Sequence, residues 1–350
     1  MDLPELSNEQ RRQLVDAKQA FASWREADRE FRHSFKGTMR WVKVGKTEYL
    51  YHIQSSVRRS KGPRSAETEH VKTSYMEQRA SVRQRRNRLN GRLKSMDRVN
   101  RAMGLGRMPT TAASVLRKLD EAGLLGRQIQ LVGTHSLYAF ESRAGVQFDG
   151  GLTTTADLDL LYDARQRMSL AIAENVKPEG ILGLLRQVDR SFAKTSTFRA
   201  TNDDGYYVDL IAPFRPDEGG KAPLRLGDGN DDLEAAAILG LQWLINAPKF
   251  EEIIVADDGR PLWVSCIDPR AFALHKWWVS KESSRAPVKR RRDAAQARAV
   301  ASLAADYLSM KFAAKDLTSL PLQFVQCAKD LLAATREEAR KPMKRAAARG

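Results

Sequence analysis

Two short apolar runs that contain aspartates constrain this chain more than any other feature of its sequence. They are Ala156-Asp157-Leu158-Asp159-Leu160-Leu161 and Tyr207-Val208-Asp209-Leu210-Ile211. Their composition predicts buried strands, and side chains alternate along a strand, so Asp157 and Asp159 share one face. Three carboxylates inside strand cores are costly unless something compensates their charge. A divalent cation is the usual compensation, and hard oxygen ligands of this kind suit Mg²⁺.

A strand-to-helix turn lies upstream of these runs. Residues 130–132 predict a short strand, Gly133 and Thr134 follow it, and residues 135–141 predict the start of a helix. A junction of this kind offers backbone N–H groups and the positive end of a helix to an anion such as a phosphate. His135 lies beside the junction and could simply face solvent.

The order of these features resembles the nucleotidyltransferase superfamily of polymerase β type. It is most similar to a bacterial family of nucleotidyltransferase-fold proteins with a Gly-Thr…Asp-x-Asp…Asp centre. The segments that carry the resemblance are 132–141, 144–146, 154–159, 269–276 and 292–297. Thr134 stands where serine is commoner in the superfamily, although the hydroxyl is kept. The gap from Gly133 to Asp157 is longer than in the simplest members, which implies an inserted segment.

The resemblance implies a reaction and a set of residues that perform it. The reaction is the transfer of an NMP from an NTP, such as ATP, to an acceptor hydroxyl with two metal ions, Mg²⁺ or Mn²⁺. The catalytic, metal-binding carboxylates would be Asp157, Asp159 and Asp209. Gly133 and Thr134 would hold the triphosphate, and Lys276 would neutralise its charge from the opposite side.

Each of these assignments has a plainer alternative. An Asp-x-Asp pair also occurs at sheet edges, where both carboxylates face water. Asp203 and Asp204 lie close to Asp209, but residues 202–205 predict a hairpin turn, so the aspartate within the following strand is preferred. Lys276 could instead be a lysine whose stem packs at the edge of a helix.

The chain is strongly basic, with 59 Lys and Arg against 43 Asp and Glu and a formal net charge of +16. Such an excess favours a polyanionic partner through phosphate contacts and counterion release, although a solvated basic surface is the alternative. Basic residues crowd positions 79–101, where apolar residues recur at helical spacing. We therefore expect an amphipathic helix with a basic face, on which Arg83, Arg86 and Arg92 would contact nucleic acid.

The sequence predicts an α+β chain in four parts. They are an N-terminal helical region with a β-hairpin and the basic helix (1–103), a nucleotidyltransferase catalytic domain with a mixed sheet and flanking helices (104–225), a mainly helical C-terminal domain (226–335) and a basic, disordered tail (336–350). Within the first part we expect a helix over 8–35, a hairpin over 38–53 and a polar loop over 55–69.

The cysteines, the N-terminus and the apolar runs of the sequence bear on the cellular location of the protein. Two cysteines, Cys266 and Cys327, make neither a disulfide framework nor a zinc site, so a reduced cytoplasm is the simplest location. The N-terminus lacks the core of a signal peptide, and no apolar run approaches membrane-spanning length.

The acceptor is the least determined partner. RNA, such as the 3′ end of a tRNA, fits the charge and the toxin-like relatives of the superfamily, while a protein acceptor and a regulatory protein partner stay open. The alternative reading is a catalytically inactive module that keeps the fold and binds nucleic acid.

Overall fold

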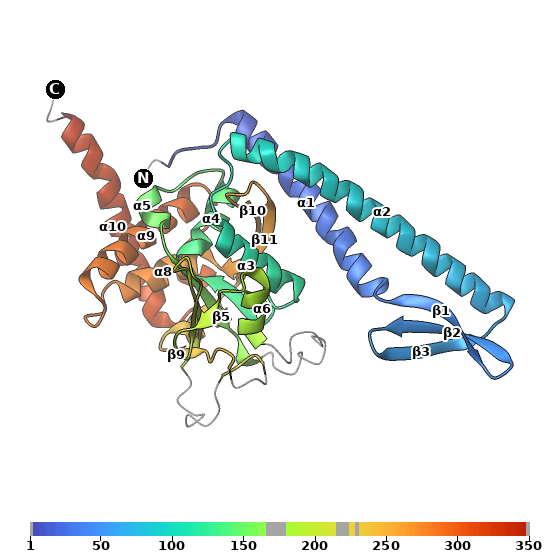
Figure 1. Cartoon of the computed structure of the whole chain (residues 1–350). Helices are drawn as coiled ribbons and strands as arrows, with labels where there is room; N and C mark the ends of the chain where they lie inside the picture. Colours follow the sequence, from blue (N-terminus) through green and yellow to red (C-terminus); the bar gives the residue numbers. More distant parts are fainter. Residues whose placement is uncertain (1–2, 166–179, 215–223, 228–230, 348–350) are drawn as a thin grey trace. The chain divides into compact units, whose positions relative to one another are not determined.

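The computed structural model of the chain describes residues 3–165, 180–214, 224–227 and 231–347, with side chains to residue 338. The chain forms two compact units (Figure 1). Unit 1 comprises Met1–Arg11, Gly106–Asp258 and Leu262–Gly350, and unit 2 comprises Arg12–Leu105 and Gly259–Pro261. Unit 2 is therefore an insertion into unit 1, whereas the sequence predicted a continuous N-terminal region over 1–103.

The first residues join unit 1 through backbone hydrogen bonds. The N–H of Leu6 donates to the carbonyl of Gly145 at 2.9 Å, and the N–H of Gln147 donates to the carbonyl of Pro4 at 2.9 Å. This pairing between segments some 140 positions apart in the sequence gives no local sequence signal, which is why the insertion was not predicted.

Two long helices form the body of unit 2, α1 (Asn8–Ser34) and α2 (Ala66–Ala102). They run antiparallel, since Gln13 bonds Asn100 at 2.8 Å and Asp28 lies 3.5 Å from Arg86. Buried and half-buried positions recur in steps of three and four along both helices: Leu14, Ala17, Phe21, Trp24, Asp28, Phe31 and Phe35 on one side, and Tyr75, Arg79, Val82, Arg86, Leu89, Leu93, Met96 and Asn100 on the other. This heptad spacing makes unit 2 an antiparallel coiled coil.

A three-stranded antiparallel sheet connects the two helices, with the strand order β1 (Thr38–Val44), β2 (Thr47–Gln54) and β3 (Val57–Pro63). The predicted helix and hairpin are confirmed. The predicted loop over 55–69 is wrong, because this segment forms β3 and then the start of α2. Nearly every residue of β3 is exposed, so this edge strand shows no hydrophobic alternation from which it could be predicted.

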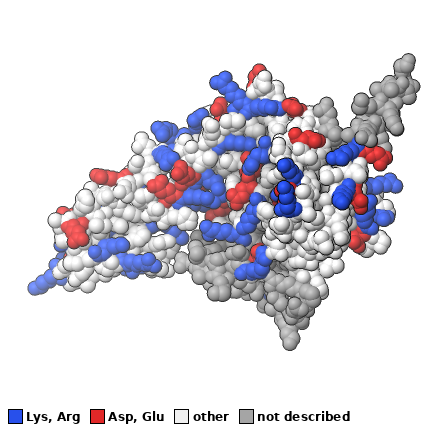
Figure 2. Space-filling view, turned by 180° about the vertical axis from the view of Figure 1, so that it is seen from behind, with Lys and Arg blue, Asp and Glu red and all other residues white. Residues whose placement is uncertain are grey.

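The basic face predicted for α2 is wrong in part, because the coiled coil takes some of the arginines for its own seam. Arg86 is half-buried beside Asp28, with its guanidinium 4.5 Å from the centre of the Phe31 ring. Arg83 and Arg92 are exposed, but nine positions amount to about 180° around a helix, so they lie on opposite sides. On the face that Figure 2 shows, Lys and Arg are spread among Asp and Glu.

A mixed eight-stranded sheet forms the centre of unit 1 and confirms the α+β fold class. Its order is β10-β11-β4-β5-β8-β7-β6, with β9 also pairing β8. The strands are β4 (Ile129–Val132), β5 (Asp157–Tyr162), β6 (Ala193–Lys194), β7 (Arg199–Thr201), β8 (Tyr207–Pro213), β9 (Ala236–Ile238), β10 (Lys249–Val255) and β11 (Pro261–Ile267). Because β10 and β11 belong to this sheet, the expected boundary at 225 falls inside unit 1.

Helices flank this sheet. They are α3 (Thr110–Glu121), α4 (Leu137–Ala144), α5 (Gly150–Thr153), α6 (Gly180–Val188), α7 (Leu241–Asn246), α8 (Pro269–Val279), α9 (Pro287–Asp306) and α10 (Leu322–Ala347). The last one extends into the tail predicted to be disordered, since the Ala, Glu, Lys and Arg residues there are good helix formers. None of the helices within the described ranges is both long enough and apolar enough to cross a membrane.

The seam predicts different effects for two arginines of α2. Arg86→Glu places a carboxylate beside Asp28 and should lower the free energy of unfolding by about 1–3 kcal/mol. Arg83→Glu changes an exposed position and should alter it by less than about 0.5 kcal/mol. Urea unfolding followed by circular dichroism measures both variants, and equal stabilities would contradict the coiled-coil assignment.

Candidate functional site

The three predicted carboxylates lie on one face of two neighbouring strands. β5 and β8 pair in parallel, with Asp159 directly opposite Asp209 in the register. Asp157 lies two residues before Asp159 and therefore points to the same side. The intervening Leu158 and the facing Val208 are fully buried on the other side of the sheet. The alternation inferred from the sequence thus brings the three aspartates together.

The carboxylates repel one another. Burial and the charges of Asp157 and Asp209 raise the pKa of Asp159 to about 6, although Lys276 and Arg199 act in the opposite direction. A carboxylate is harder to ionise when it is desolvated and lies beside like charges. The face therefore carries negative charge that its two basic neighbours balance only in part.

Arg199 is the neighbour that the sequence analysis missed. It lies on β7 directly opposite Asp209, and its Nε and Nη2 donate to the two oxygens of that carboxylate, each at 2.6 Å. Its guanidinium also lies 4.7 Å from the centre of the Tyr207 ring. This bidentate pair compensates the third carboxylate within the chain itself. Asp209 is therefore already partnered before any ligand arrives.

Gly133 brings the backbone of the upstream turn against the carboxylates. It follows β4 at φ +70 and ψ −159, a conformation open essentially to glycine alone. A Cβ built at this position would overlap the carboxylate of Asp159. The turn continues into a short 3₁₀ helix, Thr134–Ser136, and then into α4. The predicted Gly-Thr junction thus lies directly beside the carboxylate face.

Thr134 is buried and tied to the C-terminal helices. Its hydroxyl oxygen accepts a hydrogen bond from Nε2 of Gln296 at 3.2 Å, and the same nitrogen donates to the carbonyl of Leu152 at 2.7 Å. Gln296 lies on α9, is fully buried, and its Oε1 has no partner among the described residues. The hydroxyl of Thr134 therefore fixes the turn to α9, and its own proton is left to donate.

Lys276 extends from α8 and shares a partner with α9. Its Nζ donates to Oδ1 of Asp293 at 2.7 Å, and Arg285 pairs with the other carboxylate oxygen. Burial opposes ionisation of Asp293, but the two cations outweigh it and lower the pKa of this carboxyl. Since Lys276 also lowers the pKa of Asp159, its charge reaches the carboxylate face. The lysine is neither free nor remote from the predicted site.

Two further side chains complete the surroundings of Asp157. Burial lowers the pKa of His135 to about 4, and its Nε2 lies 3.2 Å from the hydroxyl of Tyr206. His135 is therefore a buried, neutral histidine at physiological pH, and not the solvent-facing one that the sequence allowed. Arg292, on α9, donates to the carbonyl of Thr154 just before β5.

The oxygen ligands suit Mg²⁺ in kind, but they are not assembled as a complete site. Among the described residues, no group of three His, Cys, Asp or Glu side chains is arranged so that it could hold a metal ion. Asp157 and Asp159 are available as a pair of ligands, whereas Asp209 is ion-paired with Arg199. Two of the three predicted ligands therefore fit a cation directly, and the third fits only without its arginine.

A family model described as Nucleotidyltransferase matches residues 110–320, about three-fifths of the chain. The chain belongs to the nucleotidyltransferase family. The matched region contains the Gly-Thr turn, all three aspartates, Lys276 and Gln296, whereas Arg83, Arg86 and Arg92 lie in unit 2, before it begins. Residues 292–297, which carry part of the resemblance, hold the turn and the lysine: Gln296 bonds Thr134 and Asp293 bonds Lys276.

One solved structure that the chain matches is that of an antigenic nucleotidyltransferase-like protein from Paracoccidioides brasiliensis. It is 18% identical over 65% of this chain and 94% of that protein, with a TM-score of 0.34. No curated protein matches the sequence significantly.

The close approach at Gly133 predicts a large loss of stability on substitution. Gly133→Ala forces a glycine-only conformation and an overlap with Asp159, so it should cost about 3 kcal/mol or more. Gly145→Ala, at the other end of α4, is the matched control: its φ is +68, but no heavy atom lies within 3.4 Å of the added Cβ. It should cost only about 1–2 kcal/mol. Thermal unfolding compares the two, and equal losses would mean that the overlap is absent.

Proposed function

We propose that the chain transfers the nucleotidyl group of an NTP to an acceptor hydroxyl. The observation that carries this proposal is the alignment of Asp157, Asp159 and Asp209 on one face, against the backbone of the Gly133 turn. Carboxylates paired in register beside a glycine turn that leads into a helix are groups that metal-assisted phosphoryl chemistry uses. Membership of the nucleotidyltransferase family supports the same reaction class.

Each residue would have a defined part. Asp157 and Asp159 would hold Mg²⁺, or Mn²⁺ in its place, which supplies charge stabilisation to the attacking and leaving oxygens. The N–H groups after Gly133 and the hydroxyl proton of Thr134 would orient the triphosphate. Lys276 would meet the phosphate charge from the α8 side while Asp293 holds the ammonium in place.

Asp209 would act last, because Arg199 occupies it. An NTP brings phosphate oxygens that compete with a carboxylate for a guanidinium. When Arg199 turns to the phosphates, Asp209 is freed to complete the cation site and to take the proton of the acceptor hydroxyl. Arg199 would thus pair with Asp209 in the protein without ligand, and with the triphosphate once the NTP is bound.

The acceptor that best fits the charge is RNA. The net charge of +16 favours a polyanion, and Arg83 and Arg92 are exposed cations of unit 2 without an ion pair in the described residues. Arg86 is excluded from this role by its place in the seam. A protein acceptor is the other outcome that a labelling experiment would reveal.

A second candidate is a nucleic-acid-binding module that no longer catalyses transfer. The salt bridge between Arg199 and Asp209 is the observation that favours it, because a saturated third carboxylate is what an inactive copy would tolerate. The two candidates differ in whether Arg199 can leave its partner.

Label transfer separates these functions. Incubation with each α-labelled NTP, Mg²⁺ and separate RNA and protein pools should label one pool and release pyrophosphate. Asp159→Asn and Asp209→Asn should each lower the rate at least about 100-fold, because each removes charge that the transition state needs. Asp203→Asn, in the neighbouring turn, should stay near the wild-type rate. Wild-type transfer by Asp209→Asn would show that the third carboxylate is misassigned.

Arg199 gives a test of the cation site that does not require transfer. Arg199→Ala leaves Asp209 without its partner, so the variant should be less stable than the wild type by about 1–3 kcal/mol. Added Mn²⁺ should then raise its melting temperature more than that of the wild type, because three carboxylates are open to the ion. Arg190→Ala, which removes an exposed arginine elsewhere in the chain, controls for the loss of a positive charge. Equal shifts in all three proteins would rule out Asp209 as a ligand.

A further inference from the structure

The three-stranded sheet of unit 2 has two different faces. One packs against α2: Met39 and Leu50 are buried there, and the His52 ring lies 5.7 Å from that of Tyr75 on the helix. Trp41, opposite Leu50 in the register, has the ammonium of Lys72 5.6 Å from its ring centre. Because side chains alternate along each strand, every second residue points to the other face.

That other face, the open face, carries two tyrosines on its central strand. Tyr49 and Tyr51 of β2 point to it, opposite Val42 and Arg40 of β1 in the register. On the other side of Tyr51 the register partner is Ser60 of β3, and Arg58 pairs with the next open-face residue of β2. The two rings are two positions apart, about 6.8 Å along the strand.

The tyrosines and arginines of the open face have no polar partners among the residues that the structure describes. Neither tyrosine hydroxyl makes a hydrogen bond to a described residue, and Arg40 and Arg58 are exposed without an ion pair in the described ranges. Most arginines of α2's seam, in contrast, are engaged with α1. Among the described helices, α2 makes the most extensive contacts with β1 and β3, and it covers the face opposite the tyrosines.

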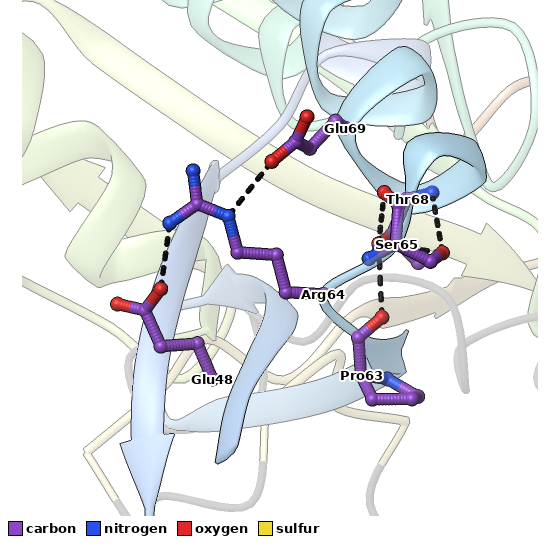
Figure 3. A network of polar contacts seen from close by, with 6 residues as sticks. All are labelled: Glu48, Pro63, Arg64, Ser65, Thr68 and Glu69. Carbon is purple, nitrogen blue, oxygen red and sulfur yellow. Dashed lines mark hydrogen bonds and ion pairs between the residues drawn. The ribbon is translucent and has the colours of Figure 1, made fainter.

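The charged residues of the sheet are predominantly basic. Residues 38–63 contain six basic side chains, Arg40, Lys43, Lys46, Arg58, Arg59 and Lys61, and a single acid, Glu48. That acid is paired with Arg64, which donates to it at 2.6 Å and also to Glu69 of α2 at 2.8 Å (Figure 3). A polyanion approaching the open face therefore meets uncompensated positive charge.

The sheet is also held rigidly from its far side. Ser65 and Thr68 form a capping box at the start of α2, and the hydroxyl of Thr68 donates to the carbonyl of Pro63 at 2.9 Å (Figure 3). Together with Arg64, these contacts fix the end of β3 to the helix. The tyrosines are thus presented on a fixed platform, which lowers the entropy lost on binding.

We propose that the open face of β1–β3 binds single-stranded nucleic acid, with bases stacked on Tyr49 and Tyr51 and phosphates contacted by Arg40 and Arg58. Aromatic rings on an open, basic sheet are a sequence-tolerant surface for unpaired bases. A duplex hides the faces of its bases and cannot stack on the rings. The proposal concerns unit 2 alone and does not depend on the transfer reaction.

Binding of the full chain to fluorescent 12-nucleotide single strands, as RNA and as DNA, tests it by anisotropy. The double variant Tyr49→Ala, Tyr51→Ala should weaken binding of the single strand at least about tenfold, since stacking contributes at each base. The matched double variant Tyr49→Phe, Tyr51→Phe keeps both rings and should stay within about twofold. Circular dichroism establishes that both variants are folded.

Further arms of the experiment separate the sources of affinity. Removing the charges with Arg40→Ala and Arg58→Ala should weaken binding and flatten its dependence on KCl, because fewer counterions are released. Affinity for a blunt duplex of the same sequence should be unaffected by the tyrosine changes. The RNA and DNA strands show which nucleic acid is preferred.

Three results would overturn the proposal. They are wild-type affinity in the alanine double variant, an equal loss in the phenylalanine control, and tyrosine-dependent binding of poly-glutamate in place of the oligonucleotides. The last would identify an acidic peptide as the partner. The anisotropy assay contains neither NTP nor a divalent cation, so a failure of the transfer assay and a failure of this proposal would be told apart.

Discussion

Like-charge repulsion among three aspartates on adjacent strands is the constraint on which the candidate site depends. Parallel pairing of β5 with β8 places Asp159 beside Asp209, and alternation along β5 adds Asp157. Such a cluster is unfavourable in a half-buried setting unless cations face it. Arg199 and Lys276 supply that charge from β7 and α8: Arg199 bonds Asp209 directly, and the charge of Lys276 acts on Asp159.

The cations also explain why distant parts of the chain meet at this place. Lys276 stays beside the sheet because Asp293 of α9 holds it, and α9 is joined to the Gly-Thr turn by Gln296. The turn in turn fits against Asp159 only because Gly133 has no side chain. The turn, the strands and the helices are thus joined by specific contacts around the three aspartates.

Local patterns in the sequence predicted the elements that surround the three aspartates, but not the contacts that join those elements. The bounds of β5 and α8 follow from apolar runs, and the shared face of Asp157 and Asp159 follows from alternation. The role of Arg199 depended on the length of one turn. The predicted turn over residues 202–205 would pair Thr201 with Tyr206 and set Phe198 opposite Asp209, whereas the structure pairs Thr201 with Tyr207 and so sets Arg199 there. The bond from Gln296 to Thr134 spans 162 positions and has no local signal.

The heptad seam of unit 2 has a consequence of its own. Two antiparallel helices joined through a sheet can lose or gain seven residues each without disturbing the phase of their contacts. Each such step would shift the β1–β3 sheet by about 10 Å along the coiled-coil axis. The number of heptads in the two helices therefore sets the length of the coiled coil. That length fixes how far the sheet lies from the other end of the helices.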